Sequence, residues 1–309
     1  MNGSLRVHGA TLRVCGATLH HEVRGEGPPL LLIPGGTGGA ASLEAVAADL
    51  AAEYTVVTYD PRGLGRSPLD DPEAEQRVAE HADDALRLLD LLAPGEPARV
   101  FGSSSGAIVA LHLLTAHQER LERVVAHEPP VVEVLPDAAV HRALVARVRE
   151  TFRTEGLMPA MAVFAAGLSK DGEQADRKDG ESADRKDGEP ANPPSEPPEP
   201  PEPPEPAELR LAQQAAARPE QTMAGLPFFV GRIVPGFMSY VPDVDRLAAL
   251  SDRLVLAAGQ DSRGELPYRP AAYLAERFGA ELVHFPGGHT GLTTHPVAFA
   301  ELLRKILRA

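Results

Sequence analysis

The segment 99–113 constrains this chain more than any other. It opens with a short apolar run that ends at Phe101, and it closes with the periodic apolar pattern of a helix. Between them, residues 102–106 read Gly-Ser-Ser-Ser-Gly, which has the form Gly-x-Ser-x-Gly. A strand, a sharp turn and a helix around this pattern predict a nucleophile elbow, on which the central serine stands clear of the sheet. The flanking glycines leave room for the neighbouring backbone. We therefore predict that Ser104 is a nucleophile.

Strand and helix patterns alternate along most of the chain, after a hairpin pattern at 11–23. The predicted strands that follow are Leu30–Ile33, Tyr54–Tyr59, 99–101, Leu121–His127, Arg253–Ala258 and Glu281–Phe285. The predicted helices are Ser42–Glu53, Ala74–Leu92, Pro270–Phe278 and His295–Leu307. Such alternation predicts an α/β fold with a doubly wound, mostly parallel sheet, whose ligands bind at the carboxyl ends of the strands.

The middle of the chain interrupts this alternation. Residues 133–250 carry helical patterns, and we predict that they form a helical lid inserted into a core made of 1–132 and 251–309. A low-complexity stretch lies within the lid at about 170–206, where an eight-residue polar motif nearly repeats and Glu-Pro triplets follow. Such a repeat is too short and too polar to stack as a structural unit. We expect a disordered Asp/Glu/Pro-rich spacer there, with no specific partner.

Composition excludes several classes of partner. The 309 residues are 43% apolar, enough for a large buried core, and the net charge of −14 disfavours nucleic acid and anionic membranes. No apolar run approaches the roughly 18 residues of a membrane span, and no signal-peptide pattern is visible. The single cysteine, Cys15, suits a reducing compartment. We predict a cytoplasmic protein without nucleic acid or membrane partners, and the oligomeric state stays open.

A glycine-rich loop follows the strand at 30–33 and reads Pro-Gly-Gly-Thr-Gly-Gly at 34–39. In a serine hydrolase, a loop at this place donates one backbone N–H to the developing oxyanion, and the residue after the nucleophile donates another. We predict Gly36 and Ser105 as these two donors.

The same loop also fits a dinucleotide site. Residues 36–41 match Gly-x-Gly-x-x-Ala after a strand, and Asp60 ends the next strand, where a ribose-binding acid would stand. An NAD-binding oxidoreductase is therefore an alternative. It explains the loop, but it explains neither the elbow nor the histidine described next.

His289 is the predicted general base. It follows the last predicted strand, and the glycines around it let its loop approach the site. An acid must hold its imidazole in the correct tautomer. The first candidate is Asp261, which follows the penultimate strand and precedes His289 in the chain order Ser, Asp, His. The alternative is Glu128, which closes the strand 121–127.

Taken together, these residues resemble the α/β-hydrolase superfamily, over 11–130 and 253–308. The most specific match is 59–67, Tyr-Asp-Pro-Arg-Gly-Leu-Gly-Arg-Ser, which is similar to the family's Asp-x-Arg-Gly-x-Gly-x-Ser loop. The resemblance implies an eight-stranded sheet, a Ser-His-acid triad, an oxyanion hole and an acyl or carbonyl substrate. It implies no cofactor and no metal.

Two positions depart from the family's pattern. Pro34 stands where the family usually has histidine before glycine. Many members also place the acid three residues after the glycine that ends the penultimate strand, where this chain has Ser262, one residue past Asp261. Zearalenone-lactonase-like members use a glutamate after the sixth strand instead, and the offset of Glu128 from Ser104 matches that arrangement.

We expect an esterase- or lactonase-type serine hydrolase that works through an acyl-enzyme. Bulky apolar side chains in the predicted lid favour a small apolar or aromatic carbonyl substrate. They are Met158, Met161, Phe164, Phe228, Phe229 and Phe237. The alternative from another class is a catalytically weak ligand-binding protein that keeps the fold and the triad.

Overall fold

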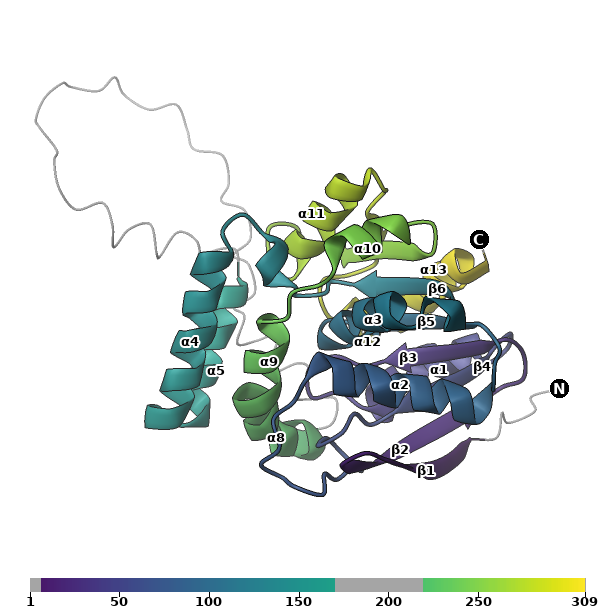
Figure 1. The fold of residues 1–309 in the computed structure, drawn as a ribbon, viewed down its shortest axis with the longest axis horizontal. Coiled ribbons are helices and arrows are strands. Elements are labelled where there is room, and N and C mark those ends of the chain that lie inside the picture. The colour runs from purple at the N-terminus through teal and green to yellow at the C-terminus, as the bar shows by residue number, and fades with distance from the viewer. Residues whose placement is uncertain (1–6, 170–218, 309) are drawn as a thin grey trace, which may run out of the picture.

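The computed structural model describes residues 7–169 and 219–308, so the predicted spacer at about 170–206 lies outside the described residues. Within the described part, one eight-stranded sheet has the strand order β1-β2-β4-β3-β5-β6-β7-β8 (Figure 1). The strands are β1 (His8–Val14), β2 (Ala17–Arg24), β3 (Pro29–Ile33), β4 (Thr55–Tyr59), β5 (Ala98–Ser103), β6 (Leu121–His127), β7 (Leu254–Gly259) and β8 (Val283–Phe285). The β1–β2 and β2–β4 pairs are antiparallel, and the other pairs are parallel. The predicted mostly parallel α/β sheet is confirmed.

Helices cover both faces of this sheet. Figure 1 shows α2 and α3 on one face, with α1 and α13 on the other. The helices are α1 (Glu44–Leu50), α2 (Val78–Leu92), α3 (Ser105–Ala116), α4 (Ala138–Glu155), α5 (Leu157–Leu168), α8 (Pro219–Phe228), α9 (Val234–Met238), α10 (Val244–Ala249), α11 (Tyr268–Phe278), α12 (Gly291–Thr294) and α13 (Pro296–Arg308). A π-helical turn, Phe229–Ile233, joins α8 to α9.

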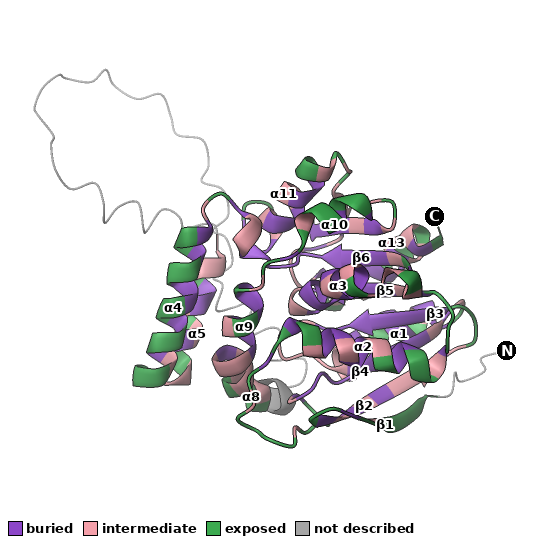
Figure 2. Cartoon of the chain, in the orientation of Figure 1, coloured by how far each residue is buried: buried purple, intermediate pink, exposed green. Residues whose placement is uncertain are grey.

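The burial of the strands follows their place in the sheet. All five residues of β3 are buried, as expected of a central parallel strand with helices on both faces. Most of the edge strand β1 is exposed instead (Figure 2). The continuous apolar run of β3 and the alternating pattern of β2 therefore reflect two different environments within one sheet.

One predicted boundary differs in a way that local hydrogen bonds explain. The helix expected from residue 74 begins at Val78, because Arg77 has an extended backbone. Gln76 is buried just before it, and its Oε1 lies 3.0 Å from Nε2 of His81. The Gln76 side chain also donates to the carbonyl of Ala74 at 3.0 Å, a local side chain-to-backbone bond of the kind that competes with helix formation.

A second group of helices stands beyond the carboxyl ends of the parallel strands (Figure 1). We call α4, α5, α8, the π-helical turn and α9 the inserted helices. Their buried side chains form a cluster of their own, which includes Val148, Phe164 and Val230. A backbone hydrogen bond of 3.1 Å from Leu266 to Leu168 ties α5 to the loop after β7. Helix α10 packs on α3 and adds Leu247 to the core of the sheet.

None of the helices over 7–169 and 219–308 combines the length and the apolarity needed to span a bilayer.

The contact between β5 and α3 depends on a glycine, and this gives a first prediction. A Cβ on Gly102 would lie 2.4 Å from the carbonyl oxygen of Gly106 and 2.8 Å from Cα of Ala107. Both are backbone atoms, so the whole helix would have to shift. We expect Gly102→Ala to lower the free energy of unfolding by about 3 kcal/mol or more, measured by urea denaturation.

Gly9→Ala is the matched control. A Cβ there meets only the His20 ring, at 3.5 Å, which is an ordinary contact. The free energy of unfolding of Gly9→Ala should stay within about 0.5 kcal/mol of the wild-type value. Equal unfolding free energies for the two variants would contradict the steric argument.

Candidate active site

The turn between β5 and α3 has the geometry of a nucleophile elbow. Ser104 adopts φ 54° and ψ −122°, a strained backbone conformation for a residue with a Cβ. Its N–H donates to the carbonyl of His127 on the neighbouring strand at 2.9 Å. The following helix also approaches β3 closely, since a Cβ on Gly106 would lie 2.4 Å from the Ile33 carbonyl oxygen. The serine is thus held between two strands and the start of a helix.

Ser104, His289 and Glu128 form a continuous hydrogen-bonded chain. The distance between Ser104 Oγ and His289 Nε2 is 3.1 Å. On the other side of the ring, His289 Nδ1 lies 2.5 Å from Oε2 of Glu128. With the carboxylate ionised, Nδ1 carries the proton and donates it to Glu128, so Nε2 is left to accept the serine hydroxyl. This arrangement can remove a proton from Ser104 as its oxygen attacks an electrophile.

Glu128 is held rigidly at the end of β6. Its side chain is fully buried, and its φ of 49° turns the backbone immediately after the strand. Oε1 accepts the N–H of Gly259 at 2.8 Å, and the Glu128 N–H donates to the carbonyl of Ala257 at 2.9 Å. Strand β7 therefore fixes one carboxylate oxygen while the other faces His289.

The electrostatics of this pair favour an ionised carboxylate beside a basic imidazole. Burial by itself raises the pKa of Glu128, but the hydrogen bond and charge of His289 outweigh it, and the pKa lies below its ordinary value. Burial by itself lowers the pKa of His289, but the hydrogen bond and charge of Glu128 outweigh that, and the pKa is raised. Each group thus stabilises the charged form of the other.

The structure brings Glu128, and not Asp261, to the imidazole. Asp261 lies in the exposed turn after β7, where its N–H donates to the carbonyl of Gly287 at 3.1 Å. Over residues 7–169 and 219–308, the partner of His289 Nδ1 is Glu128, and the carboxylate of Asp261 forms no hydrogen bond or ion pair with this ring. The next residue, Ser262, is fully buried instead and contributes to lowering the pKa of Glu128. One step along a tight turn reverses the direction of a side chain, and this explains why the first candidate acid faces outward.

The loop 34–39 lies directly against the elbow. A Cβ on Gly35 would lie 2.5 Å from the Ser103 carbonyl oxygen and 2.8 Å from Cβ of Ser104. Gly36, with φ 60°, donates its N–H to Oγ of Ser105 at 3.0 Å. Ser105 begins α3, where a helix has no internal acceptor for the first amides. The Gly36 N–H, one of the two predicted oxyanion donors, is therefore already hydrogen-bonded to the side chain of Ser105, the residue that carries the other. The sequence did not indicate this bond.

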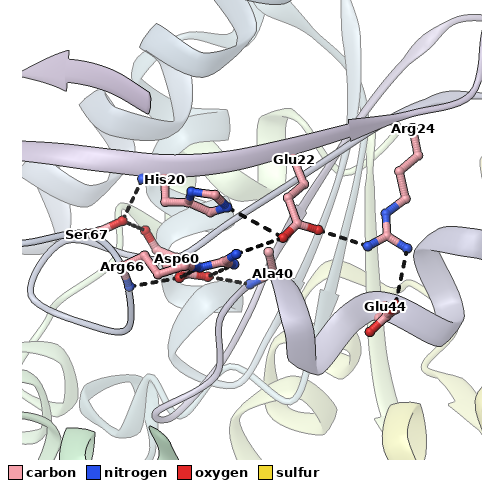
Figure 3. Close-up of polar contacts among 8 residues, drawn as sticks. All are labelled: His20, Glu22, Arg24, Ala40, Glu44, Asp60, Arg66 and Ser67. Atoms are coloured by element: carbon pink, nitrogen blue, oxygen red, sulfur yellow. Dashed lines mark hydrogen bonds and ion pairs between the residues drawn. The ribbon is translucent and has the colours of Figure 1, made fainter. Parts of the chain in front are cut away.

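The carboxylate of Asp60 holds Ala40, the residue that follows this loop (Figure 3). Oδ1 of Asp60 accepts the N–H of Ala40 at 2.9 Å, and Oδ2 accepts the N–H and Nε–H of Arg66 at 2.9 and 2.8 Å. Arg66 continues to Glu22, which pairs with Arg24. Burial raises the pKa of Asp60, but the hydrogen bonds of Arg66 and Ala40 outweigh it and lower that pKa. Both carboxylate oxygens are engaged within the protein, and neither faces a ribose as the dinucleotide interpretation requires.

The remaining residues of the 59–67 motif hold the motif itself in place. Arg62 makes a bidentate, buried pair with Asp84 of α2, with both distances 2.6 Å. Ser67 donates to the carbonyl of Asp60 at 2.6 Å and accepts the N–H of His20 at 2.8 Å. These bonds fasten the 59–67 segment to β2 and α2.

A cavity of about 10 Å³ lies between this loop and the inserted helices. Gly36 and Ser105 line it on one side, and Ile233 and Phe237 of the inserted helices line it on another. Most of the other lining side chains are apolar, and the ring of His81 is buried, which lowers its pKa to about 3 and keeps it neutral. A cavity of this size holds at most about one water molecule.

Comparisons with known proteins place the chain in a family. A model of the α/β hydrolase fold matches residues 28–296. The chain is 33% identical over 307 residues to an uncharacterized hydrolase, YraK, of Bacillus subtilis, covering 98% of this chain and 97% of that protein.

Two solved structures share the fold. An esterase from Thermogutta terrifontis is similar at a TM-score of 0.69 and 19% identity, covering 97% of this chain and 98% of its own. An enol-lactonase from Burkholderia xenovorans is similar at a TM-score of 0.65 and 17% identity, covering 97% of this chain and 100% of its own. The extent of the family match and of the YraK match shows that this chain belongs to the α/β-hydrolase fold family and is a hydrolase of that family.

Proposed function

We propose that this protein is a serine hydrolase that cleaves an ester or lactone through an acyl-enzyme. The observation that carries the proposal is the chain from Ser104 Oγ to His289 at 3.1 Å and from His289 to Glu128 at 2.5 Å. In the first step the serine oxygen attacks the carbonyl carbon, and Nε2 of His289 takes the hydroxyl proton. Glu128 stabilises the imidazolium that results.

The rest of the reaction follows from the same groups. His289 returns its proton to the leaving alkoxide as the bond from carbon to the leaving oxygen breaks, which leaves Ser104 acylated. A lactone keeps its leaving alcohol attached to the acyl group. Water then attacks the acyl-enzyme with His289 as base, and the carboxylic acid and free Ser104 are formed. The backbone N–H of Ser105 and the loop that carries Gly36 stabilise the oxyanion in both halves of the reaction.

The surroundings favour an apolar or aromatic acyl group. The cavity beside Gly36 is lined mainly by apolar side chains, including Leu64, Ile233 and Phe237. At about 10 Å³ it is too small for an organic substituent. We therefore propose that the inserted helices act as a lid, which moves away from the loop 61–64 when substrate binds.

The direct test is steady-state turnover on a panel of p-nitrophenyl esters of increasing acyl length and of aliphatic and aromatic lactones. We expect sustained turnover on at least one apolar member, together with a trapped acyl-enzyme seen by intact mass. Ser104→Ala is the control for background hydrolysis. A single slow turnover, or none above that control, would instead fit a ligand-binding protein.

A further inference from the structure

We propose that the side-chain hydroxyl of Ser105 donates to the oxyanion in place of the Gly36 N–H, alongside the backbone N–H of Ser105. In this proposal, the hydroxyl oxygen accepts the Gly36 N–H and the hydroxyl proton is donated to the oxyanion. The proposal rests on the proposed serine hydrolase function and assigns one more group to that site.

The first observation is the hydrogen bond itself. Gly36 N–H donates to Ser105 Oγ at 3.0 Å, across 69 residues of sequence. The same N–H is a predicted oxyanion donor, and in this structure the hydroxyl oxygen of Ser105 accepts it. A hydroxyl has one proton to donate and two lone pairs to accept. Because Gly36 uses one lone pair, the proton of Ser105 is free to turn toward a newly formed anion.

The hydroxyl belongs to the residue that follows the proposed nucleophile. Gly35 is so close to the elbow that a Cβ on it would lie 2.8 Å from Cβ of Ser104. A Cβ built on Gly36 meets no atom within 4 Å, so the space beside its Cα is open. Gly36 and Ser105 also line the same water-sized cavity. The hydroxyl, the amide and the room for one oxygen atom are thus found together.

The arrangement also strengthens the hydroxyl as a donor. A group that accepts one hydrogen bond is polarised and donates a second one better, and this cooperativity is larger where water is excluded. The Gly36 amide is itself fixed, since Asp60 holds the loop at Ala40. A rigid amide behind a rotatable hydroxyl therefore provides a donor that can follow the oxyanion as it forms.

The test compares the wild type with Ser105→Ala and Ser105→Thr on the ester that the wild type hydrolyses best. We expect Ser105→Ala to lower kcat by about 10- to 100-fold with KM changed less than about threefold. The affinity for an alkyl boronic acid, which forms a tetrahedral anion on Ser104, should fall by a similar factor. The affinity for a neutral amide analogue of the substrate should not change. Ser105→Thr, which keeps the hydroxyl, should regain most of the lost activity.

Two results would overturn the proposal. An unchanged or higher kcat in Ser105→Ala would mean that the hydroxyl only occupies, or blocks, the Gly36 amide. Equal losses in the alanine and threonine variants, with boronate and amide affinities reduced alike, would mean that the side chain only supports the loop. If the wild type itself shows no turnover above Ser104→Ala, it is the proposed function that fails.

Discussion

Replacing Ser104 by alanine is expected to lower kcat by about 10⁴- to 10⁶-fold and to abolish labelling by a fluorophosphonate probe. The variant loses the proposed attacking oxygen, which is the hydrogen-bond partner of His289 Nε2. The residual rate comes from substrate binding and the oxyanion donors. Intact mass after probe treatment and steady-state kinetics on the best ester measure the two effects.

Ser103→Ala is the matched control for this prediction. Ser103 is the last residue of β5 and is buried, one position from the proposed nucleophile. Its replacement should leave probe labelling intact. Labelling that survives in Ser104→Ala but disappears in Ser103→Ala would show that the nucleophile has been assigned to the wrong serine.

The second large effect is expected from Glu128→Gln, with a loss in kcat of about 10³- to 10⁴-fold. Glutamine has nearly the same shape, and its oxygen can still accept the Gly259 N–H that Oε1 now accepts. Its amide group would face Nδ1 of His289, where it favours the tautomer whose proton sits on Nε2. That nitrogen then has no lone pair for the proton of Ser104.

Asp261→Asn is the control that separates the two candidate acids. Asp261 lies in an exposed turn, so the kcat of Asp261→Asn should differ from that of the wild type by less than about threefold. Thermal melting of both variants verifies that each is folded. If Asp261→Asn is the more damaging of the two substitutions, the assignment of the acid to Glu128 is wrong.

The pH dependence provides an independent measure of the same pair. Only the neutral imidazole can act as the base, so kcat/KM falls as the pH drops through the pKa of His289 in the free enzyme. Glu128 raises that pKa above its ordinary value of 6.5, so the acid limb of the wild type should lie above pH 6.5. In Glu128→Gln the charge is lost while burial still lowers the pKa. The residual activity should therefore show an acid limb displaced to lower pH, and an unmoved limb would contradict the coupling.

Local sequence patterns were sufficient to predict the fold. The strand β6 was predicted at Leu121–His127 without error, and the other strands within a few residues, because an apolar run in a parallel sheet is buried on both faces. The elbow was equally local, since its strand, its Gly-x-Ser-x-Gly turn and its helix are consecutive in the chain, and Gly102 meets the backbone of nearby Gly106. The start of α2 was not predicted correctly: the apolar pattern begins at residue 74, but Arg77 is extended and the helix begins at Val78.

The sequence by itself determined the architecture, the elbow serine and the histidine loop, since each follows from residues that are neighbours along the chain. Only the tertiary structure decided which acid meets the imidazole and what occupies the Gly36 amide. Glu128 reaches His289 across 161 residues, and Ser105 reaches Gly36 across 69. Such choices depend on the direction of a side chain at the end of a strand, and one residue in a turn changes that direction. Hydrophobic periodicity in the sequence does not predict the direction of such a side chain.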